Sequence, residues 1–238
     1  MDEDNDRYPL HTAAREGKVA KAEGLLKTDP KLSQKRDDDG RYAIHWAVSS
    51  NNLDIVVLLV NHPAFDPDVQ DGSGWTPLMI SASVPNGEAV LKMLLQKGAN
   101  VNEKNSNGQS ALHFVASKKN MDIARMLIEA KPAASTRIRD RRGQYPIHRA
   151  AAAGSEPMVN LLLQNMSPLN PTDDEGYTPL HHAVAEGHGD VAVALLKHGA
   201  DFGIKNRAEE LALDLAPDKE VRLYIIQGAE REGVDLSL

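Results

Sequence analysis

GYTPLHHAVAEGHGDVAVALLKHG, residues 176–199, is the stretch that decides the fold of this chain. Its opening phrase, TPLH at Thr178, has counterparts in YPLH at Tyr8, YAIH at Tyr42, TPLM at Thr76, SALH at Ser110, YPIH at Tyr145 and LALD at Leu211. Successive starts are 34, 34, 34, 35, 33 and 33 residues apart. A period this regular indicates one supersecondary unit that is copied seven times and stacked.

Each repeat begins with the signals of a short helix. A Thr or Ser hydroxyl at the start of the phrase can accept a hydrogen bond from the first turn, so Thr76, Ser110 and Thr178 are predicted N-caps. A proline at the next position fits the first helical residue, where no N–H donor is needed. Tyrosine replaces the hydroxyl at Tyr8, Tyr42 and Tyr145, which should cost each of these helix starts about 1 kcal/mol.

A stop, a second helix and a polar loop complete the unit. Glycine, or asparagine in one repeat, ends the first helix in a left-handed conformation, at Gly17, Asn51, Gly154 and Gly187. The second helix carries an apolar stripe such as Ile55, Val56 and Leu59, which can be buried only against neighbouring repeats. The loops then end in tight turns, namely DDDG at Gly40, DGSG at Gly74, NSNG at Gly108, DRRG at Gly143 and DDEG at Gly176.

Composition limits the classes of partner. The chain has 238 residues, with 27 Lys plus Arg against 34 Asp plus Glu, a net charge of −7. This charge argues against non-specific attraction to nucleic acid or anionic lipid. There is no cysteine, and hence no disulfide or thiolate metal site. Because the first residues are acidic and no apolar run is long enough to span a bilayer, we expect a soluble protein of the cytoplasm and nucleus.

Several patterns that would indicate chemistry have structural explanations. The repeated histidines are predicted to hydrogen-bond at helix starts, because stacked helices are about 10 Å apart, too far for them to share a metal ion; they are His11, His45, His113, His148 and His181. The string GHGDVA at Gly187 matches a loose dinucleotide motif, but it lies between two helices and follows no strand. We therefore expect no enzyme activity, no cofactor and no metal.

The phrase TPLHxAA, the glycine stop, the VxxLL helix and the DxxG turn in this frame resemble the ankyrin repeat. The resemblance implies an all-α ankyrin-repeat solenoid of seven helix-turn-helix repeats with β-hairpin or turn fingers. The expected division is an acidic tail over residues 1–7, one repeat domain over residues 8–228 and a C-terminal tail over residues 229–238. An extra residue near Pro85 to Gly87 should change one turn. Glu209 in place of the tip glycine, and Pro217, mark the seventh repeat as a cap.

Narrower strings, among them DGRYAIHWAVS from Asp39 and ALHFVASKK from Ala111, resemble the gankyrin family of proteasome assembly chaperones. The resemblance implies a non-enzymatic chaperone of the 19S regulatory particle. Its concave face would clasp the C-terminal domain of one base ATPase subunit and hinder premature docking on the 20S core. It should be a monomer on its own, with neither nucleic acid nor membrane as a partner.

Thirteen residues are predicted to bind the partner: Asp38, Asp39, Arg41, Trp46, Asp71, Trp75, Phe114, Lys118, Lys119, Arg142, Arg149, Tyr177 and Glu186. Five of them, Asp39, Arg41, Asp71, Trp75 and Lys118, match positions on the family's finger and groove surface. The resemblance implies that Trp75 and Tyr177 face the concave groove, where we expect them to anchor an interface; the alternative is that each only covers its neighbouring tip. Trp46 is expected to be mostly core, with one edge available to a ligand. The basic run Arg137 to Arg142 is either a solvated turn or a contact with an acidic patch.

Two other functions stay open at this stage. A general ankyrin adaptor, or an inhibitor of a cell-cycle kinase or transcription factor, would share the fold but use another surface. A nucleic-acid-associated regulator would need a basic face. Co-purification with proteasomal base subunits, and a salt-dependent shift on DNA, separate these alternatives from the chaperone.

Overall fold

The computed structural model describes residues 6–236, in which the contacts define two compact units. Unit 1 extends to Ser106 and includes Ala130–Ala133, and unit 2 contains Asn107–Glu129 and the chain from Ala134 onward. That these units act as one domain stays a prediction. The expected acidic tail lies partly outside the described residues, which begin at Asp6.

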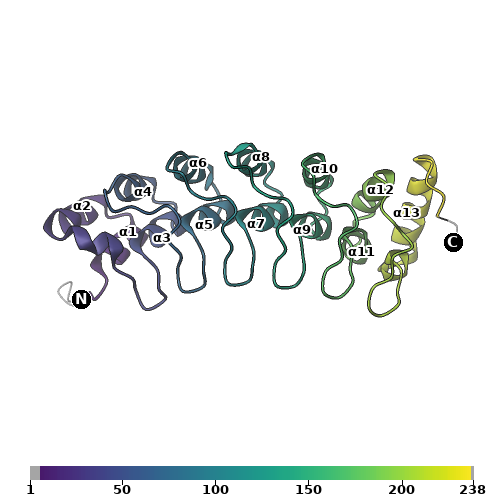
Figure 1. Cartoon of the computed structure of the whole chain (residues 1–238), viewed down its shortest axis with the longest axis horizontal. Coiled ribbons are helices and arrows are strands. Elements are labelled where there is room, and N and C mark those ends of the chain that lie inside the picture. The colour runs from purple at the N-terminus through teal and green to yellow at the C-terminus, as the bar shows by residue number, and fades with distance from the viewer. Residues whose placement is uncertain (1–5, 237–238) are drawn as a thin grey trace. The chain divides into compact units, whose positions relative to one another are not determined.

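Unit 1 is a stack of three helix pairs (Figure 1). Its elements are α1 Pro9–Glu16, α2 Val19–Thr28, the 3₁₀ turn η2 Pro30–Gln34, α3 Ala43–Ser49, α4 Leu53–Val60, α5 Pro77–Ser83 and α6 Glu88–Gln96. The first helices pack in the order α1, α3, α5, and the second helices in the order α2, α4, α6. The loops project on the side of the first helices, away from the second helices.

Unit 2 repeats the same arrangement. Its elements are α7 Ala111–Lys118, α8 Met121–Glu129, α9 Pro146–Ala152, α10 Glu156–Gln164, α11 Pro179–Ala185, α12 Gly189–Lys197, the 3₁₀ turn η3 Ala212–Leu215 and α13 Lys219–Arg231. The first helices α7, α9 and α11 pack in order and end against η3, while α8, α10 and α12 end against α13. The prediction of an all-α ankyrin-repeat stack is confirmed. Among residues 6–236, β structure is limited to the bridge between Lys205 and Leu211.

Small and apolar side chains explain the close packing of the helices. An alanine shortly after each of the first six phrases is 3% exposed or less, at Ala13, Ala47, Ala82, Ala116, Ala150 and Ala183. The apolar stripes of the second helices are equally buried, as Ile55, Ile123 and Leu162 illustrate. Burial of this kind contributes roughly 1.5–3 kcal/mol for each large apolar side chain.

The helix-start histidines have the predicted hydrogen-bonding role. Nδ1 of His45 accepts from the N–H of Tyr42 at 3.1 Å, and Nδ1 of His148 accepts from the N–H of Tyr145 at 3.0 Å. Thr76 and Thr178 cap as predicted. Ser110 is the N-cap of α7, where its N–H donates to Nδ1 of His113 and its backbone oxygen accepts the N–H of His113, both at 3.1 Å. His11 also differs, since Asp6 takes the N–H of Tyr8.

The irregular repeats differ where the sequence indicated. Asn86 has a φ of 58° in the turn between α5 and α6, and a Cβ on Gly87 would collide with the carbonyl of Ser81. In the seventh repeat the first helix is reduced to η3. The predicted domain end at residue 228 falls inside α13, because this helix continues to Arg231. Gly228 and Ala229, on either side of that boundary, are both buried.

Within residues 6–236, the structure contains no helix that is long and apolar enough to cross a membrane.

Candidate functional site

The projecting loops are closed by one carboxylate or amide oxygen each. Oδ1 of the residue three positions before the loop glycine, or before Glu209 in the last loop, accepts two backbone N–H groups, at 2.8–3.0 Å, from the residues two and four positions later. We call these five tip-closing residues; they are Asp37, Asp71, Asp140, Asp173 and Asn206. The same residue donates its N–H to the carbonyl four positions later. Each tip is therefore a rigid turn.

Neighbouring tips are joined by backbone hydrogen bonds. In unit 1, the N–H of Gly72 donates to the oxygen of Asp39 and that of Ser106 to the oxygen of Ser73, both at 2.9 Å. In unit 2, the same bond joins Arg141 to Asn107 at 2.8 Å and Asp174 to Arg142 at 3.0 Å. The tips and the adjacent side of the first helices thus form one continuous surface in each unit. We call this surface the tip face.

In unit 1, charged and aromatic side chains of the tip face form one cluster. Arg41 lies 4.7 Å from the ring of Trp46, and its Nε lies 3.4 Å from Oδ2 of Asp71. Nε1 of Trp46 donates to Oδ2 of Asp37 at 2.7 Å. Trp46 is half-buried, with part of its side chain exposed.

The other predicted residues of unit 1 have different surroundings. Asp39 is exposed at the tip, and Asp38 is exposed but accepts hydrogen bonds from Arg7 and the hydroxyl of Tyr8. Trp75 is half-buried. The side chain of Asp71 is only 4% exposed and is used by its own turn and by Arg41. Asp71 therefore stabilises the face rather than offering a free charge to a partner.

In unit 2, the predicted residues lie on the tips and on the first helices. Phe114 and Tyr177 are half-buried, and Arg142 is exposed at its tip. Lys118, Lys119 and Glu186 are exposed at the ends of α7 and α11, where Lys119 has a φ of 59° and occupies the left-handed helix stop. That backbone role of Lys119 was not predicted.

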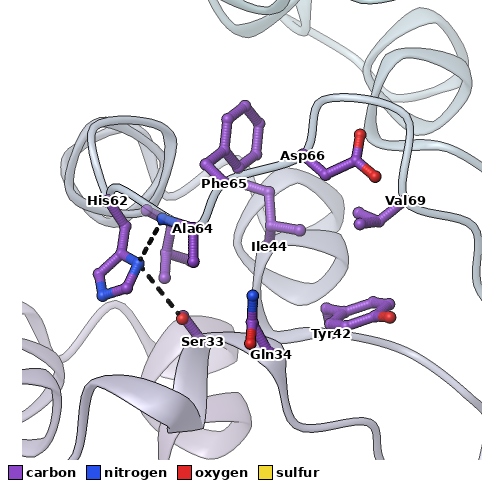
Figure 2. A pocket seen from close by; sticks show the side chains of 10 residues that line it. Ser33, Gln34, Tyr42, Ile44, His62, Ala64, Phe65, Asp66 and Val69 are labelled. Carbon is purple, nitrogen blue, oxygen red and sulfur yellow. Dashed lines mark hydrogen bonds between the residues drawn. The ribbon is translucent and has the colours of Figure 1, made fainter.

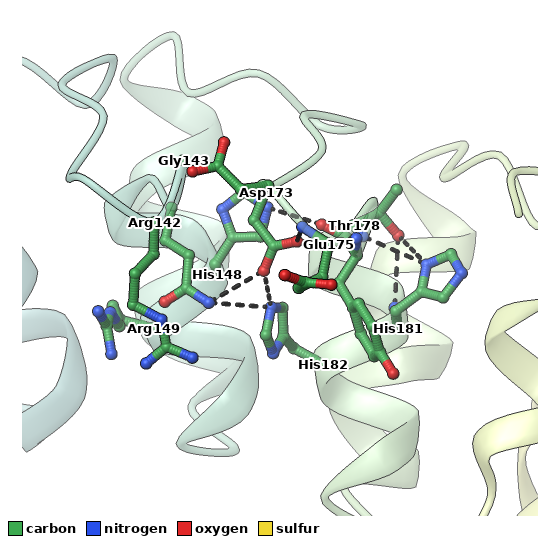
Figure 3. A network of polar contacts seen from close by, with 12 residues as sticks. Arg142, Gly143, His148, Arg149, Asp173, Glu175, Thr178, His181 and His182 are labelled. Atoms are coloured by element: carbon green, nitrogen blue, oxygen red, sulfur yellow. Dashed lines mark hydrogen bonds and ion pairs between the residues drawn. The ribbon is translucent and has the colours of Figure 1, made fainter. Parts of the chain in front are cut away.

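Two tip-closing residues of unit 2, Asp140 and Asp173, also bind side chains, and Figure 3 shows the network around Asp173. Asp140 Oδ2 accepts from Nη2 of Arg149 at 2.8 Å. Asp173 Oδ2 lies 2.9 Å from Nε2 of His182 and accepts from Nε2 of Gln144 at 3.0 Å. Burial raises the pKa of Asp140 and of Asp173. The side-chain bonds and the backbone N–H groups together lower it by more than burial raises it, so both carboxylates have a pKa below the usual range. Both stay charged at neutral pH.

The helix-start histidines, unlike these charged carboxylates, are neutral at neutral pH. Because Nδ1 accepts a backbone N–H, Nε2 carries the proton and donates to carbonyls of the next repeat, as His148 does to Pro171 and Tyr177 at 3.1 and 3.2 Å. Burial lowers the pKa of His113 and of His148 to about 4. These neutral, buried rings connect repeats and are not available for acid–base chemistry.

Sequence reasoning missed the tip-closing residues. The signal was present, since each quoted turn begins with Asp or Asn three positions before its glycine. An Asp or Asn at the start of a tight turn commonly bonds backbone N–H groups further along. His182 was also missed, because its neighbour His181 occupies the recognised position of the phrase.

A separate pocket of about 360 Å³ lies in unit 1, between η2 and the loop after α4 (Figure 2). Ile44, Leu59, Phe65 and Tyr42 are among its lining residues. Nδ1 of His62 lies 3.3–3.4 Å from the N–H of Ala64 and the hydroxyl of Ser33. None of the thirteen predicted contact residues lines this pocket. Over the described part of the chain, no three His, Asp or Glu side chains are placed to hold a metal ion.

Comparison with known proteins gives consistent matches. The family model described as ankyrin repeats (3 copies) matches residues 1–71, 63–140 and 130–206. The chain is 38% identical over 226 residues, 92% of its length, to the probable 26S proteasome regulatory subunit p28 of Saccharomyces cerevisiae, covering 97% of that protein. It is 35% identical over 217 residues, 90% of its length, to an ankyrin repeat-containing protein of Schizosaccharomyces pombe, covering 92% of it.

Solved structures agree on the fold. The ankyrin repeat domain of Bcl-3 matches with a TM-score of 0.75 and 25% identity, over 94% of this chain and 99% of that one. The ankyrin repeat domain of human ASB11 matches with a TM-score of 0.79 and 20% identity, over 92% of this chain and 97% of that one.

Proposed function

The chain belongs to the ankyrin-repeat proteins and, within them, to the gankyrin family that includes yeast p28, and on that premise we propose that it is an assembly chaperone of the proteasome. It binds the C-terminal domain of one base ATPase subunit through its tip face. The observation that carries the proposal is the 38% identity to a proteasome regulatory subunit over nearly the whole of both chains. The cytoplasmic and nuclear location expected from the sequence is part of the same proposal.

The tip face has the chemistry of a protein interface. Half-buried aromatic side chains, Trp46 and Trp75 in unit 1 and Phe114 and Tyr177 in unit 2, supply anchors whose burial contributes much of an interface's affinity. The backbone bonds between tips hold these anchors in place before binding, which lowers the ordering cost of association. A binding protein of this kind needs no catalytic group.

Charge on the tips sets register. The exposed tip charges are acidic at Asp38 and Asp39 in unit 1, and in unit 2 they change from Arg141 and Arg142 to Asp174 and Glu175. A partner with matching basic and acidic segments is favoured over one of a single sign. Such complementarity acts mainly on association rate and specificity. The proposed mechanism is occlusion, in which the bound chain hinders docking of the ATPase on the 20S core until assembly is complete.

The first experiment is capture from cell extract with the full chain as bait, followed by mass spectrometry. Base ATPase subunits should be enriched. Binding is then measured by calorimetry with the isolated C-terminal domain of each captured subunit. Reversal of two exposed tip charges, Asp39→Lys with Arg142→Glu, should weaken binding by about tenfold or more, because each reversal replaces attraction by repulsion.

A matched control reverses two exposed charges on the second helices, Glu23→Lys on α2 and Arg125→Glu on α8. This variant has the same net-charge change but leaves the tip face intact, so its affinity should equal that of the wild-type chain. Capture of kinase or transcription-factor complexes without any base ATPase would favour the general adaptor instead.

A further inference from the structure

Three tip-closing carboxylates each make a second contact in the same sequence register. Oδ2 lies 2.7–2.9 Å from a nitrogen of the side chain nine residues later on the following first helix. The pairs are Asp37 with Trp46, Asp140 with Arg149 and Asp173 with His182. One oxygen therefore closes the turn, and the other holds a side chain of the tip face.

The side chains held in this way are chemically different, although the carboxylate is the same. An indole, a guanidinium and an imidazole occupy equivalent positions, and all three are half-buried, with part of each ring or fork open to solvent. At the buried helix-start position, which serves the fold, five of the seven phrases have the same residue, histidine. Variation at a position that is held rigidly and exposed is what a recognition surface requires.

In two of these side chains, the tip carboxylate binds one end and leaves the rest unbound by it. The ring of Trp46 lies under Arg41 at 4.7 Å and near Arg15 at 5.7 Å, so its edge and not its face is fixed by Asp37. Arg149 uses one terminal nitrogen on Asp140, while its Nε is buried with no partner within residues 6–236. In both cases the carboxylate binds one end of the side chain, and this bond sets the orientation of the indole or guanidinium before any partner binds.

Resting on the proposed function, we propose that Trp46, Arg149 and His182 determine the specificity of the tip face, and that Asp37, Asp140 and Asp173 are positioning residues that hold them through Oδ2. Holding a side chain before binding removes part of its ordering cost. An immobilised side chain of this size corresponds to about a fivefold change in affinity. The turn itself does not depend on Oδ2.

The sixth tip shows that closing the turn and holding a side chain of the following helix are separate roles. Asn206 closes the sixth tip through Oδ1 with bonds of 2.9 and 3.0 Å, and its Nδ2 donates to Glu210 at 2.8 Å. An amide at the tip-closing position therefore keeps the turn and removes the second acceptor. Asp37→Asn should leave the tip closed and release the indole N–H of Trp46.

The test is a double-mutant cycle with Asp37→Asn and Trp46→Phe, measured by calorimetry against the isolated C-terminal domains of the base ATPase subunits at a temperature where circular dichroism shows all variants folded. Trp46→Phe alone should weaken binding about tenfold. Asp37→Asn should weaken it about fivefold in the wild-type chain, and should change it far less in the Trp46→Phe background. Asp66→Asn, an exposed turn carboxylate of unit 1 away from the tips, is the matched control and should change nothing.

Equal effects of Asp37→Asn in both backgrounds, or full affinity of Trp46→Phe, would overturn the proposal. A second readout needs no partner. The chain has two tryptophans, and only the indole N–H proton resonance of Trp46 should move in Asp37→Asn, with that of Trp75 unchanged. If the wild-type chain bound none of the domains, the proposed function would fail, whereas an unmoved Trp46 resonance would by itself refute positioning by Asp37.

Discussion

His181 and His182 are neighbours in α11, but their side chains have different surroundings. His181 is fully buried, holds the start of α11 through Thr178 and reaches the carbonyl of Glu210 in the next repeat. His182 is half-buried on the tip face and pairs with the tip carboxylate of Asp173. The first belongs to a framework repeated along the chain, and the second to a surface that varies. Stability and binding should therefore respond to different residues only one position apart.

Acid should break the framework first. The pKa of His113 and of His148 is about 4 in the folded chain, below the ordinary value of 6.5, so the unfolded chain binds more protons between these values. Stability is complete above pH 6.5 and falls as the pH decreases toward 4. At pH 5 each histidine should remove about 2 kcal/mol, or about 4 kcal/mol together. Urea unfolding at pH 7.5 and pH 5 measures the difference, and equal free energies would contradict the assignment.

Alanine at the two neighbouring histidines sharpens the contrast. His181→Ala leaves a cavity and unpaired backbone groups, and should cost about 3 kcal/mol of unfolding free energy. His182→Ala should cost about 1 kcal/mol, because Asp173 keeps its bond from Gln144. Thermal unfolding gives the first comparison, and binding at low temperature should reverse the order. If His182→Ala proved the more destabilising of the two, the division into framework and surface would be wrong.

Glycine substitutions test the rigidity of the tips. Gly40 has a φ of 70°, and a Cβ there would lie 2.8 Å from the N of Gly72, the donor of the bond between tips. Gly40→Ala should cost about 2 kcal/mol from strain and lost contact. Gly98 has a φ of 83° but open space around it, so Gly98→Ala should cost about 1 kcal/mol. Chemical denaturation measures both, and equal losses would show that the contact between tips contributes nothing.

The smallest effect on stability is expected at the exposed tip charges. Asp39→Lys and Arg142→Glu should each change the free energy of unfolding by less than about 0.5 kcal/mol. Their effect should appear instead in the association rate with the partner and in its dependence on salt. Stopped-flow association at two salt concentrations is the measurement. A loss of stability comparable to that of Gly40→Ala would place these residues in the framework.

The sequence predicted what depends on local signals. The capping residues Thr76 and Thr178, the helix stops at Gly17 and Asn51, and the role of His148 follow from residue type and spacing, and all agree with the structure. These features depend on bonds within a few residues. They can therefore be derived before the repeats are stacked.

What could not be predicted depends on contacts between segments. Asp71 looked like a free charge in a polar loop, but the turn folds back on itself and Arg41 of the preceding tip covers it. The hydrogen bond from Trp46 to the carboxylate nine residues earlier was not predicted. Lys119 looked like a contact and also ends α7. Each outcome requires the three-dimensional position of a group that spacing alone does not give.

The most direct test of the central claim, that the tip face grips the partner, is hydroxyl-radical footprinting of the chain with and without the isolated ATPase C-terminal domain. Trp46, Trp75 and Tyr177 should become protected in the complex. Tyr224 and Met166, which are 51% and 72% exposed away from the tip face, should react as before. Protection of Tyr224 and Met166 with unchanged oxidation of the two tryptophans would contradict the account.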